Sequence, residues 1–383
     1  MRFQTTSLQI HDADCQWLTG DLSNDCQHIR TIMSKRCRRR FLQVARSHFD
    51  SLIAQVAQRV QGKLPHVDRR AHQELSQKLS TSLVDGETVL FEDPGALGDY
   101  TLRRLRPRCR ALFEVLLAQN CTELVESLLK RLDLCRKEER EFRVASLGGG
   151  PGFDAIAMLA ALAALKEASQ QEPSANLWSE RFPTEDCADC AVRCKVLDLA
   201  PAWTIALSAV SDVASEIWPW QSADFIELIA PSDLRDSMAT SAVEEVGQAD
   251  MVIAAYVLHE NEAALLVEGL LGGVIPDVFR AAPVGVPLIF LDATHRLWPA
   301  LVETARASCS SSLSEERHDV DAMPFTVIVP EGLASYIHAV VLIKDETPRT
   351  LETLSALSVF ELFKSHQKAN EMRLKRLSEL QKA

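Results

Sequence analysis

The sequence predicts an α/β protein in which a doubly wound, mostly parallel seven-stranded sheet with an antiparallel last strand follows an α-helical N-terminal domain. From Phe142 onward, short and almost continuously apolar runs alternate with helical segments, which is typical of a parallel sheet covered on both faces. The last two apolar runs are separated only by residues 331–335, which leaves no room for a crossover helix, so we expect these strands to pair antiparallel. Before Phe142, apolar residues recur every three or four positions, as in amphipathic helices.

These patterns divide the chain into three parts. We expect a helical domain over residues 1–141, a ligand-binding α/β domain over residues 142–347 and a charged helical tail over residues 348–383. Within the first part, the apolar spacing predicts a helix over residues 38–61 and one or two more over residues 111–140. Gly and Pro at residues 85–100 indicate a loop or a short strand between them.

The α/β part presents strands and helices largely in alternation. Strands are expected at residues 142–147, 194–199, 223–230, 249–258, 286–293, 325–330 and 336–344. Helices are expected at residues 153–168, 200–214, 261–282 and 296–307, with a polar insert over residues 168–192. The first of these helices is alanine-rich and apolar on nearly all sides, so we expect it to be buried.

The composition is that of a globular protein, with 47% apolar and 25% charged residues, and no apolar run reaches the roughly 18 residues of a membrane helix. Residues 1–144 hold 24 Lys and Arg against 19 Asp and Glu (+5), and the remainder holds 17 against 34 (−17), which together give −12. This asymmetry, with basic runs at residues 35–40 and 102–110, suggests an anionic partner such as RNA; the alternative is a pair of solvated helix faces. The first residues lack the order of a signal peptide, so we expect a cytoplasmic or nuclear (including nucleolar) protein without membrane contact.

Ten cysteines in a chain of 383 residues without a secretion signal indicate reduced thiols. Cys187, Cys190 and Cys194 lie close together, and the first two have the C-x2-C spacing of half a zinc site. No second pair follows at a suitable distance, so we expect no metal centre. The alternative to a metal ligand makes Cys194 a small buried residue of a strand.

A glycine-rich loop, SLGGGPGFD, follows the first expected strand of the sheet. Ligands of such sheets bind at the carboxyl ends of the strands, where the strand order reverses. Glycine admits positive φ and close approach of a ligand to the main chain, and the helix that follows presents unpaired N–H groups. Read as G-x-G-x-G, the loop offers Gly148, Gly150 and Gly152; read as G-x-G-x-x-A, ending at Ala155, it is a dinucleotide fingerprint. The glycine spacing alone leaves both interpretations open.

Five segments in order resemble motifs of class I S-adenosylmethionine-dependent methyltransferases, over residues 142–345: VASLGGGPGFD, CKVLDL, APSDLRD, ADMVIAAYVLHE and VFRAAPVGVPLIFLDAT. The resemblance implies S-adenosyl-L-methionine as cofactor, with the glycine loop under its methionine part and Asp198 on its ribose hydroxyls. Ser146 stands where the family often has an acidic residue, and we expect Asp154 to take over part of the contact with the ammonium group. The residues expected to bind the cofactor are Ser146, Gly148, Gly150, Gly152, Asp154, Asp198, Leu199, Asp233, Leu234, Ala255 and Tyr256.

The expected chemistry places modest demands on the protein. A sulfonium is a good leaving group, so such a site mainly orients the acceptor and, for a poor nucleophile, removes its proton. His259 is the candidate general base, with Glu260 to orient it; the alternative is that both simply end a strand and begin a helix. No N/D-P-P-Y run and no suitably placed cysteine occurs there, which argues against amino-adenine and covalent-cysteine chemistry.

The segment GDYTLRRLRPRCR precedes the first strand of the sheet. Methyltransferases with helical N-terminal lids often place such a stretch over the cofactor. The resemblance therefore implies that Tyr100, Arg103, Arg104 and Arg106 bind the methionine carboxylate or a substrate phosphate, to which the planar guanidinium is suited. The alternative is an exposed basic helix face.

We therefore expect a methyltransferase that acts on RNA, at a base nitrogen of ribosomal RNA. A fainter resemblance to eukaryotic large-subunit ribosomal RNA uridine-N3 methyltransferases, in the glycine loop and in the second-strand segment with Trp203, implies this acceptor. The alternatives are a small-molecule O- or N-methyltransferase and a methyltransferase-like assembly factor without activity.

Overall fold

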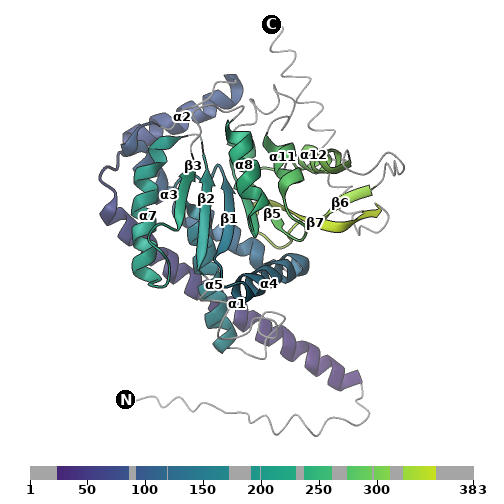
Figure 1. The fold of residues 1–383 in the computed structure, drawn as a ribbon. Coiled ribbons are helices and arrows are strands. Elements are labelled where there is room, and N and C mark those ends of the chain that lie inside the picture. The colour runs from purple at the N-terminus through teal and green to yellow at the C-terminus, as the bar shows by residue number, and fades with distance from the viewer. Residues whose placement is uncertain are drawn as a thin grey trace, which may run out of the picture.

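A seven-stranded sheet forms the centre of the protein (Figure 1). The computed structural model describes residues 24–85, 92–118, 120–171, 191–198, 200–229, 237–260, 274–295, 297–310 and 322–350. The strand order is β3-β2-β1-β4-β5-β7-β6, so the order reverses between β1 and β4. The expected fold class, a doubly wound and mostly parallel sheet preceded by helices, is confirmed.

The parallel strands present their carboxyl ends at one edge of the sheet. The strands are β1 (Phe142–Leu147), β2 (Val192–Leu197), β3 (Ile226–Ile229), β4 (Met251–Ala255), β5 (Pro287–Asp292), β6 (Ala322–Ile328) and β7 (His338–Thr350). Strands β1 to β5 pair parallel with one another, and β7 lies between β5 and β6, antiparallel to both. The short connection from β6 to β7 makes this closing pair antiparallel, as the sequence predicts.

Four helices pack together on one face of the sheet: α1 (Asn24–Lys63), α3 (Pro94–Leu117), α5 (Phe153–Gln171) and α7 (Thr204–Ile217). Helix α5 is enclosed by α1, α3 and the sheet, which explains why it is apolar on nearly all sides. Phe49 of α1 stacks on Phe113 of α3, with ring centroids 4.0 Å apart, and both belong to the same apolar cluster as Val144 of β1. The first helices therefore share a core with the sheet, while the domain boundary after residue 141 stays a prediction.

The opposite face of the sheet is covered by α8 (Ser237–Gly247), α11 (Val274–Ala281) and α12 (Trp298–Ser310). Neighbouring residues of one strand serve the two faces, since Val144 packs with the first group of helices and Ala145 with the second. Every residue of β5 is buried because helices cover both of its sides. The remaining described helices are α2 (Arg69–Asp85), α4 (Thr122–Lys137), the 3-10 turn η2 (Pro201–Trp203) and the short α9 (Val257–Glu260).

Helix α3 begins earlier than the sequence predicts. A loop or short strand is expected up to Tyr100, but the helix starts at Pro94. Asp93 caps it by accepting a first-turn N–H at 2.7 Å, and proline is well tolerated there because that N–H has no helical partner. At Gly98 an added Cβ would lie 2.1 Å from the carbonyl oxygen of His66, so glycine permits a close contact with the α1–α2 connection. The Gly and Pro residues thus serve a helix start and a close packing contact instead of a loop.

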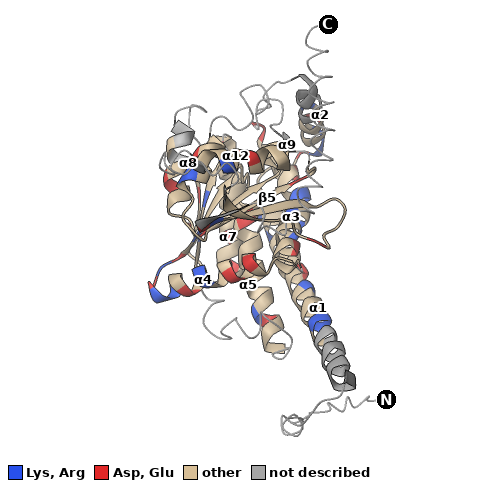
Figure 2. Ribbon diagram, turned by 90° about the vertical axis from the view of Figure 1, so that its right-hand side faces the viewer, with Lys and Arg blue, Asp and Glu red and all other residues tan. Residues whose placement is uncertain are grey.

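Helix α1 carries charges of both signs (Figure 2). Arg46 pairs with Glu114 of α3 at 2.7 Å, and Lys63 pairs with Glu216 of α7 at 2.7 Å. Each of these partly exposed ion pairs contributes little to stability. They do show that two basic side chains of α1 already have acidic partners on neighbouring helices. No helix in the described part of the chain is long and apolar enough to cross a membrane.

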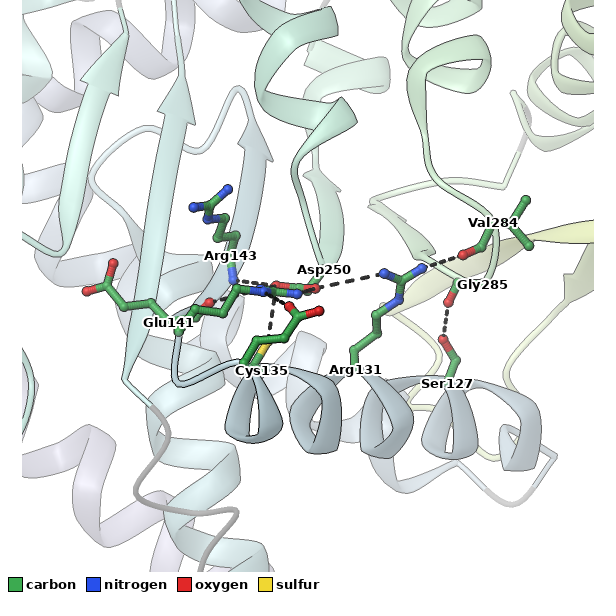
Figure 3. A network of polar contacts seen from close by, with 10 residues as sticks. Ser127, Arg131, Cys135, Glu141, Arg143, Asp250, Val284 and Gly285 are labelled. Carbon is green, nitrogen blue, oxygen red and sulfur yellow. Dashed lines mark hydrogen bonds and ion pairs between the residues drawn. The ribbon is translucent and has the colours of Figure 1, made fainter.

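At the amino ends of the strands, Asp250 fastens α4 to the sheet (Figure 3). This carboxylate is 1% exposed and directly precedes β4. It accepts two hydrogen bonds from the guanidinium of Arg140, at 2.6 and 2.9 Å, and one from the N–H of Arg143 at 3.0 Å. The thiol of Cys135 and the guanidinium of Arg131, both on α4, lie 3.3 and 4.0 Å from it. Charge-assisted bonds on several sides compensate for burying the charge.

Candidate functional site

The glycine loop joins β1 to α5 at the carboxyl edge of the sheet, where the strand order reverses. Gly148, Gly150 and Gly152 have φ values of +60°, +51° and +80°, which favour glycine. At Gly149, an added Cβ would lie 2.0 Å from Oγ of Ser146, so a side chain there would displace the serine. The loop therefore needs bare backbone, as the sequence predicts.

Next to the loop, Ser146 and Asp154 form a buried pair. The Ser146 hydroxyl donates to Oδ2 of Asp154 at 2.6 Å, and Asp154, in the first turn of α5, is 5% exposed. Burial raises the pKa of Asp154 to about 6, while the hydrogen bond from Ser146 and the positive charge of Arg108 act in the opposite direction. A cation at the loop would favour the ionised form of this carboxylate. Contact with such a cation, the ammonium group of the cofactor, is the role expected of Asp154.

Asp198 directly follows β2 and contacts the loop. Its Oδ2 accepts the N–H of Gly150 at 3.0 Å, and its Oδ1 accepts the N–H of Ala200 at 3.0 Å. The buried indole of Trp203 lies beside the same glycine, because a Cβ added at Gly150 would be 3.5 Å from its ring. The structure thus brings together the second-strand acid and the glycine loop, two parts of the predicted site.

Arg108 of α3 reaches the end of β4. The guanidinium carbon lies 3.3 Å from the ring centroid of Tyr256, and the same group donates to the Tyr100 hydroxyl at 3.3 Å and to the Ala255 carbonyl at 3.5 Å. Tyr256 has a φ of +65°, and its N–H is held by the Leu291 carbonyl at 2.6 Å. Such strained non-glycine conformations concentrate at functional sites. Burial raises the pKa of Tyr256, and the charge of Arg108 opposes this rise.

The predicted arginines of α3 have different surroundings. Arg103 binds Oδ2 of Asp99, the same oxygen that contacts Nδ1 of His72 at 2.6 Å. The side chains of Arg104 and Arg106 are exposed. Their expected contact with a carboxylate or phosphate stays a prediction.

The sequence analysis did not name Arg108 as a candidate site residue, although its spacing from Tyr100 and Arg104 points to it. Tyr100, Arg104 and Arg108 are four residues apart, so they follow one stripe of α3. The positive charge of Arg104 also acts on the pKa of Tyr256, which places it at the same edge of the sheet. The helix was not expected to begin before Tyr100, and without its phase this stripe could not be recognised.

Several predicted residues lie where the structure describes little or nothing. Leu199, Asp233 and Leu234 are outside the described residues, as are Cys187 and Cys190. Their roles stay predictions.

The predicted base and its partner lie on α9, immediately after β4. The backbone places His259 and Glu260 at the carboxyl edge, and their side chains are outside the description, so their catalytic roles stay predictions. Cys194 is buried in β2, and burial raises the pKa of its thiol. Among the described residues, no group of three His, Cys, Asp or Glu side chains could hold a metal ion.

Two histidines that the sequence analysis missed meet at the ends of β5 and β7. Nδ1 of His295 lies 3.2 Å from Nδ1 of His338, with ring centroids 4.9 Å apart. His338 is also the ladder partner of Asp292, the last residue of β5, which is 1% exposed. The two histidines are far apart in sequence, and only the antiparallel register brings them together.

Some solved structures are similar to this chain at low sequence identity. No family model and no curated protein matches this chain. Similar solved structures include precorrin-6y C5,15-methyltransferase from Geobacter metallireducens (TM-score 0.27, 14% identity, covering 57% of this chain and 86% of that chain). Mitomycin 7-O-methyltransferase has a TM-score of 0.34 and 15% identity, and the match covers 70% of this chain and 67% of that chain. The 16S rRNA (adenine(1408)-N(1))-methyltransferase from Catenulisporales acidiphilia has a TM-score of 0.30 and 14% identity, and the match covers 58% of this chain and 92% of that chain.

Proposed function

We propose that this protein is an enzyme that transfers the methyl group of S-adenosyl-L-methionine to RNA. The observation that carries the proposal is the row of groups along the carboxyl ends of β2, β1 and β4. Asp198 follows β2, the positive-φ glycines follow β1, and Arg108 lies on Tyr256 after β4. An elongated ligand with hydroxyls at one end and a charged amino acid at the other fits this order.

The cofactor's chemical groups match the side chains at this edge. The Asp198 carboxylate can accept hydrogen bonds from ribose hydroxyls, and the Arg108 guanidinium can bind the methionine carboxylate through two parallel bonds. The Asp154 carboxylate offers a negative charge for the ammonium group. When bound, the cofactor supplies an activated methyl group, and the protein aligns the acceptor with it.

The sheet favours this cofactor over a dinucleotide. The common dinucleotide-binding order is 3-2-1-4-5-6. Here β7 is inserted antiparallel between β5 and β6, which is the closing pair that the methyltransferase resemblance implies. An acid after β2 would serve the ribose of either cofactor, so a binding measurement must separate them.

Isothermal titration with S-adenosylmethionine and with NAD tests the cofactor. The wild type should bind S-adenosylmethionine, and Asp198→Ala should weaken binding by about 10- to 100-fold, as for loss of a hydrogen bond to a charged group. Asp224→Ala, at an exposed carboxylate before β3, is the control and should bind as the wild type. Binding of NAD instead, or of neither ligand, would contradict the proposal.

Exposed groups on α3 and before β7 support RNA as the acceptor. Arg104 and Arg106 of α3 can contact phosphates, and Tyr336, 64% exposed before β7, offers a ring on which a base can stack. Tyr336 also acts on the pKa of Tyr256, so it lies near the end of β4.

Incubation with labelled S-adenosylmethionine, total RNA and a metabolite extract tests the acceptor. We expect label in RNA, and RNA binding that weakens steeply with salt because phosphate contacts release counterions. Label confined to the metabolite fraction would establish a small-molecule methyltransferase. Cofactor binding without transfer to either fraction would indicate an inactive assembly factor.

A further inference from the structure

The end of β4 carries a tyrosine hydroxyl to which the proposed cofactor contacts give no role. Tyr256 directly follows the strand and is half-buried. Its ring lies against the Arg108 guanidinium, but no hydrogen bond from the described part of the chain reaches its hydroxyl. A polar group of this kind calls for an explanation, and a bound molecule with a matching group would supply one.

The tyrosine is held in one orientation. Its φ of +65° is a left-handed conformation, which a non-glycine residue adopts only at a cost. The Leu291 carbonyl accepts its N–H at 2.6 Å, and the Arg108 guanidinium covers one face of its ring, 3.3 Å from the centroid. Turning the side chain away would forfeit the contact with Arg108, so the hydroxyl is positioned before any ligand arrives.

The protonation of this hydroxyl limits what it can do. Burial raises the pKa of Tyr256 above its ordinary value of 10.0, although the positive charges of Arg108 and Arg104 oppose the rise. The hydroxyl therefore keeps its proton at neutral pH and can donate it in a hydrogen bond. It is suited to hold a lone pair of the acceptor molecule, and not to remove a proton from it.

Two further groups near this hydroxyl lack partners within the described ranges. Arg104, exposed on α3, and Tyr336, 64% exposed before β7, both act electrostatically on Tyr256. Neither side chain forms an ion pair, a hydrogen bond or a ring contact with another described residue. A nucleotide offers a counterpart to each of the three groups, namely a phosphate for the guanidinium, a base face for the exposed ring and a base lone pair for the hydroxyl.

We infer that the Tyr256 hydroxyl selects the base that is methylated, an inference that rests on the proposed function. It donates a hydrogen bond to a carbonyl oxygen or an unprotonated ring nitrogen of that base, while the base stacks on Tyr336 and Arg104 binds a phosphate. Stacking alone leaves a base free to rotate in its own plane. The hydrogen bond from Tyr256 removes this freedom and fixes which edge of the base faces the methyl group.

Kinetics of methyl transfer to total RNA test the inference. Tyr256→Phe removes the hydroxyl but keeps a ring for Arg108, so kcat/KM should fall about 3- to 10-fold, the range for one neutral hydrogen bond. Tyr336→Leu should raise KM roughly 10-fold because the stacking face is lost. Trp220→Leu removes another exposed ring, before the amino end of β3, and is the control that should keep the wild-type KM.

Two further measurements separate base selection from support of the structure. Affinity for S-adenosylmethionine and melting temperature should stay at wild-type values in Tyr256→Phe. After digestion of the labelled RNA to nucleosides, label in other bases, relative to the base that the wild type modifies, should rise about 3- to 10-fold in this variant.

Several results would overturn the inference and leave the proposed function intact. They are wild-type kcat/KM or an unchanged distribution of label in Tyr256→Phe, a loss of S-adenosylmethionine affinity in that variant, and a wild-type KM in Tyr336→Leu. A wild type that binds no S-adenosylmethionine, or that methylates only metabolites, would overturn the proposed function and this inference with it.

Discussion

Asp154 is a residue through which the stability of the fold should depend on pH. Burial under the first turn of α5 raises its pKa from an ordinary value of 3.8 to about 6. Because the folded state holds this proton more tightly than the unfolded chain, protonation contributes stability. That contribution is complete below the unfolded pKa and is lost as the pH rises through about 6. At neutral pH the protein therefore keeps a costly buried charge, which a bound ammonium group would stabilise.

Asp154→Asn should remove this pH dependence. Between pH 4 and 7 the wild type should lose roughly 2–3 kcal/mol of unfolding free energy relative to the variant, since about two pH units in pKa correspond to roughly 3 kcal/mol. Urea unfolding at a series of pH values measures it, with the exposed Asp212→Asn on α7 as control. At pH 7 the variant should also bind S-adenosylmethionine more weakly. Parallel stability profiles for the wild type and Asp154→Asn would contradict the raised pKa.

At the scale of the element, the position of α3 determines which side chains of the N-terminal part reach the candidate site. Its start is fixed by Asp93, and its middle is held against α5 by the Cys109 thiol, which donates to the Phe153 carbonyl at 3.3 Å. This register places Tyr100 and Arg108 together at the end of β4. A shift of one residue would rotate Arg108 by about 100° around the helix and remove it from that edge.

Arg108→Gln should distinguish binding of the cofactor's amino acid part from support of the fold. Affinity for S-adenosylhomocysteine should fall about 10- to 100-fold, because a hydrogen-bonded charge pair with its carboxylate is lost. Affinity for 5′-methylthioadenosine, which lacks the amino acid part, should not change. Arg136→Gln, at an exposed position of α4 by the amino edge of the sheet, is the control and should bind both ligands as the wild type does. Equal losses for both ligands would show that Arg108 acts by supporting the site's structure.

At the scale of the whole molecule, much of the α/β part could be predicted because each buried strand is a short apolar run. Strand β1 has the predicted bounds, and the glycine loop and Asp198 stand at adjoining strand ends as the pattern indicates. The contribution of Arg108 could not be predicted, because it depends on where α3 begins. The contact of His295 with His338 depends on the pairing register of β5 with β7, which a single sequence does not contain.

The carboxyl and amino edges of the sheet hold different kinds of groups. The carboxyl edge carries the glycine loop and the proposed cofactor contacts, whereas the amino edge carries the Asp250 network (Figure 3). Ser127 of α4 extends this attachment by donating to the Gly285 carbonyl at 2.6 Å. Changes at the amino edge should therefore alter stability without altering ligand binding.

Asp250→Asn tests this division. The amide would turn donors toward the guanidinium of Arg140 and leave that charge poorly compensated, so unfolding in urea should show a loss of about 2–4 kcal/mol. The lower part of the range is expected because Arg140 is 26% exposed. Asp133→Asn, which breaks exposed pairs within α4, should cost no more than about 1 kcal/mol. Folded Asp250→Asn should bind S-adenosylmethionine with wild-type affinity, because the proposed cofactor contacts lie at the other end of the strands. A parallel loss of affinity would show that α4 and the carboxyl edge are coupled through the sheet.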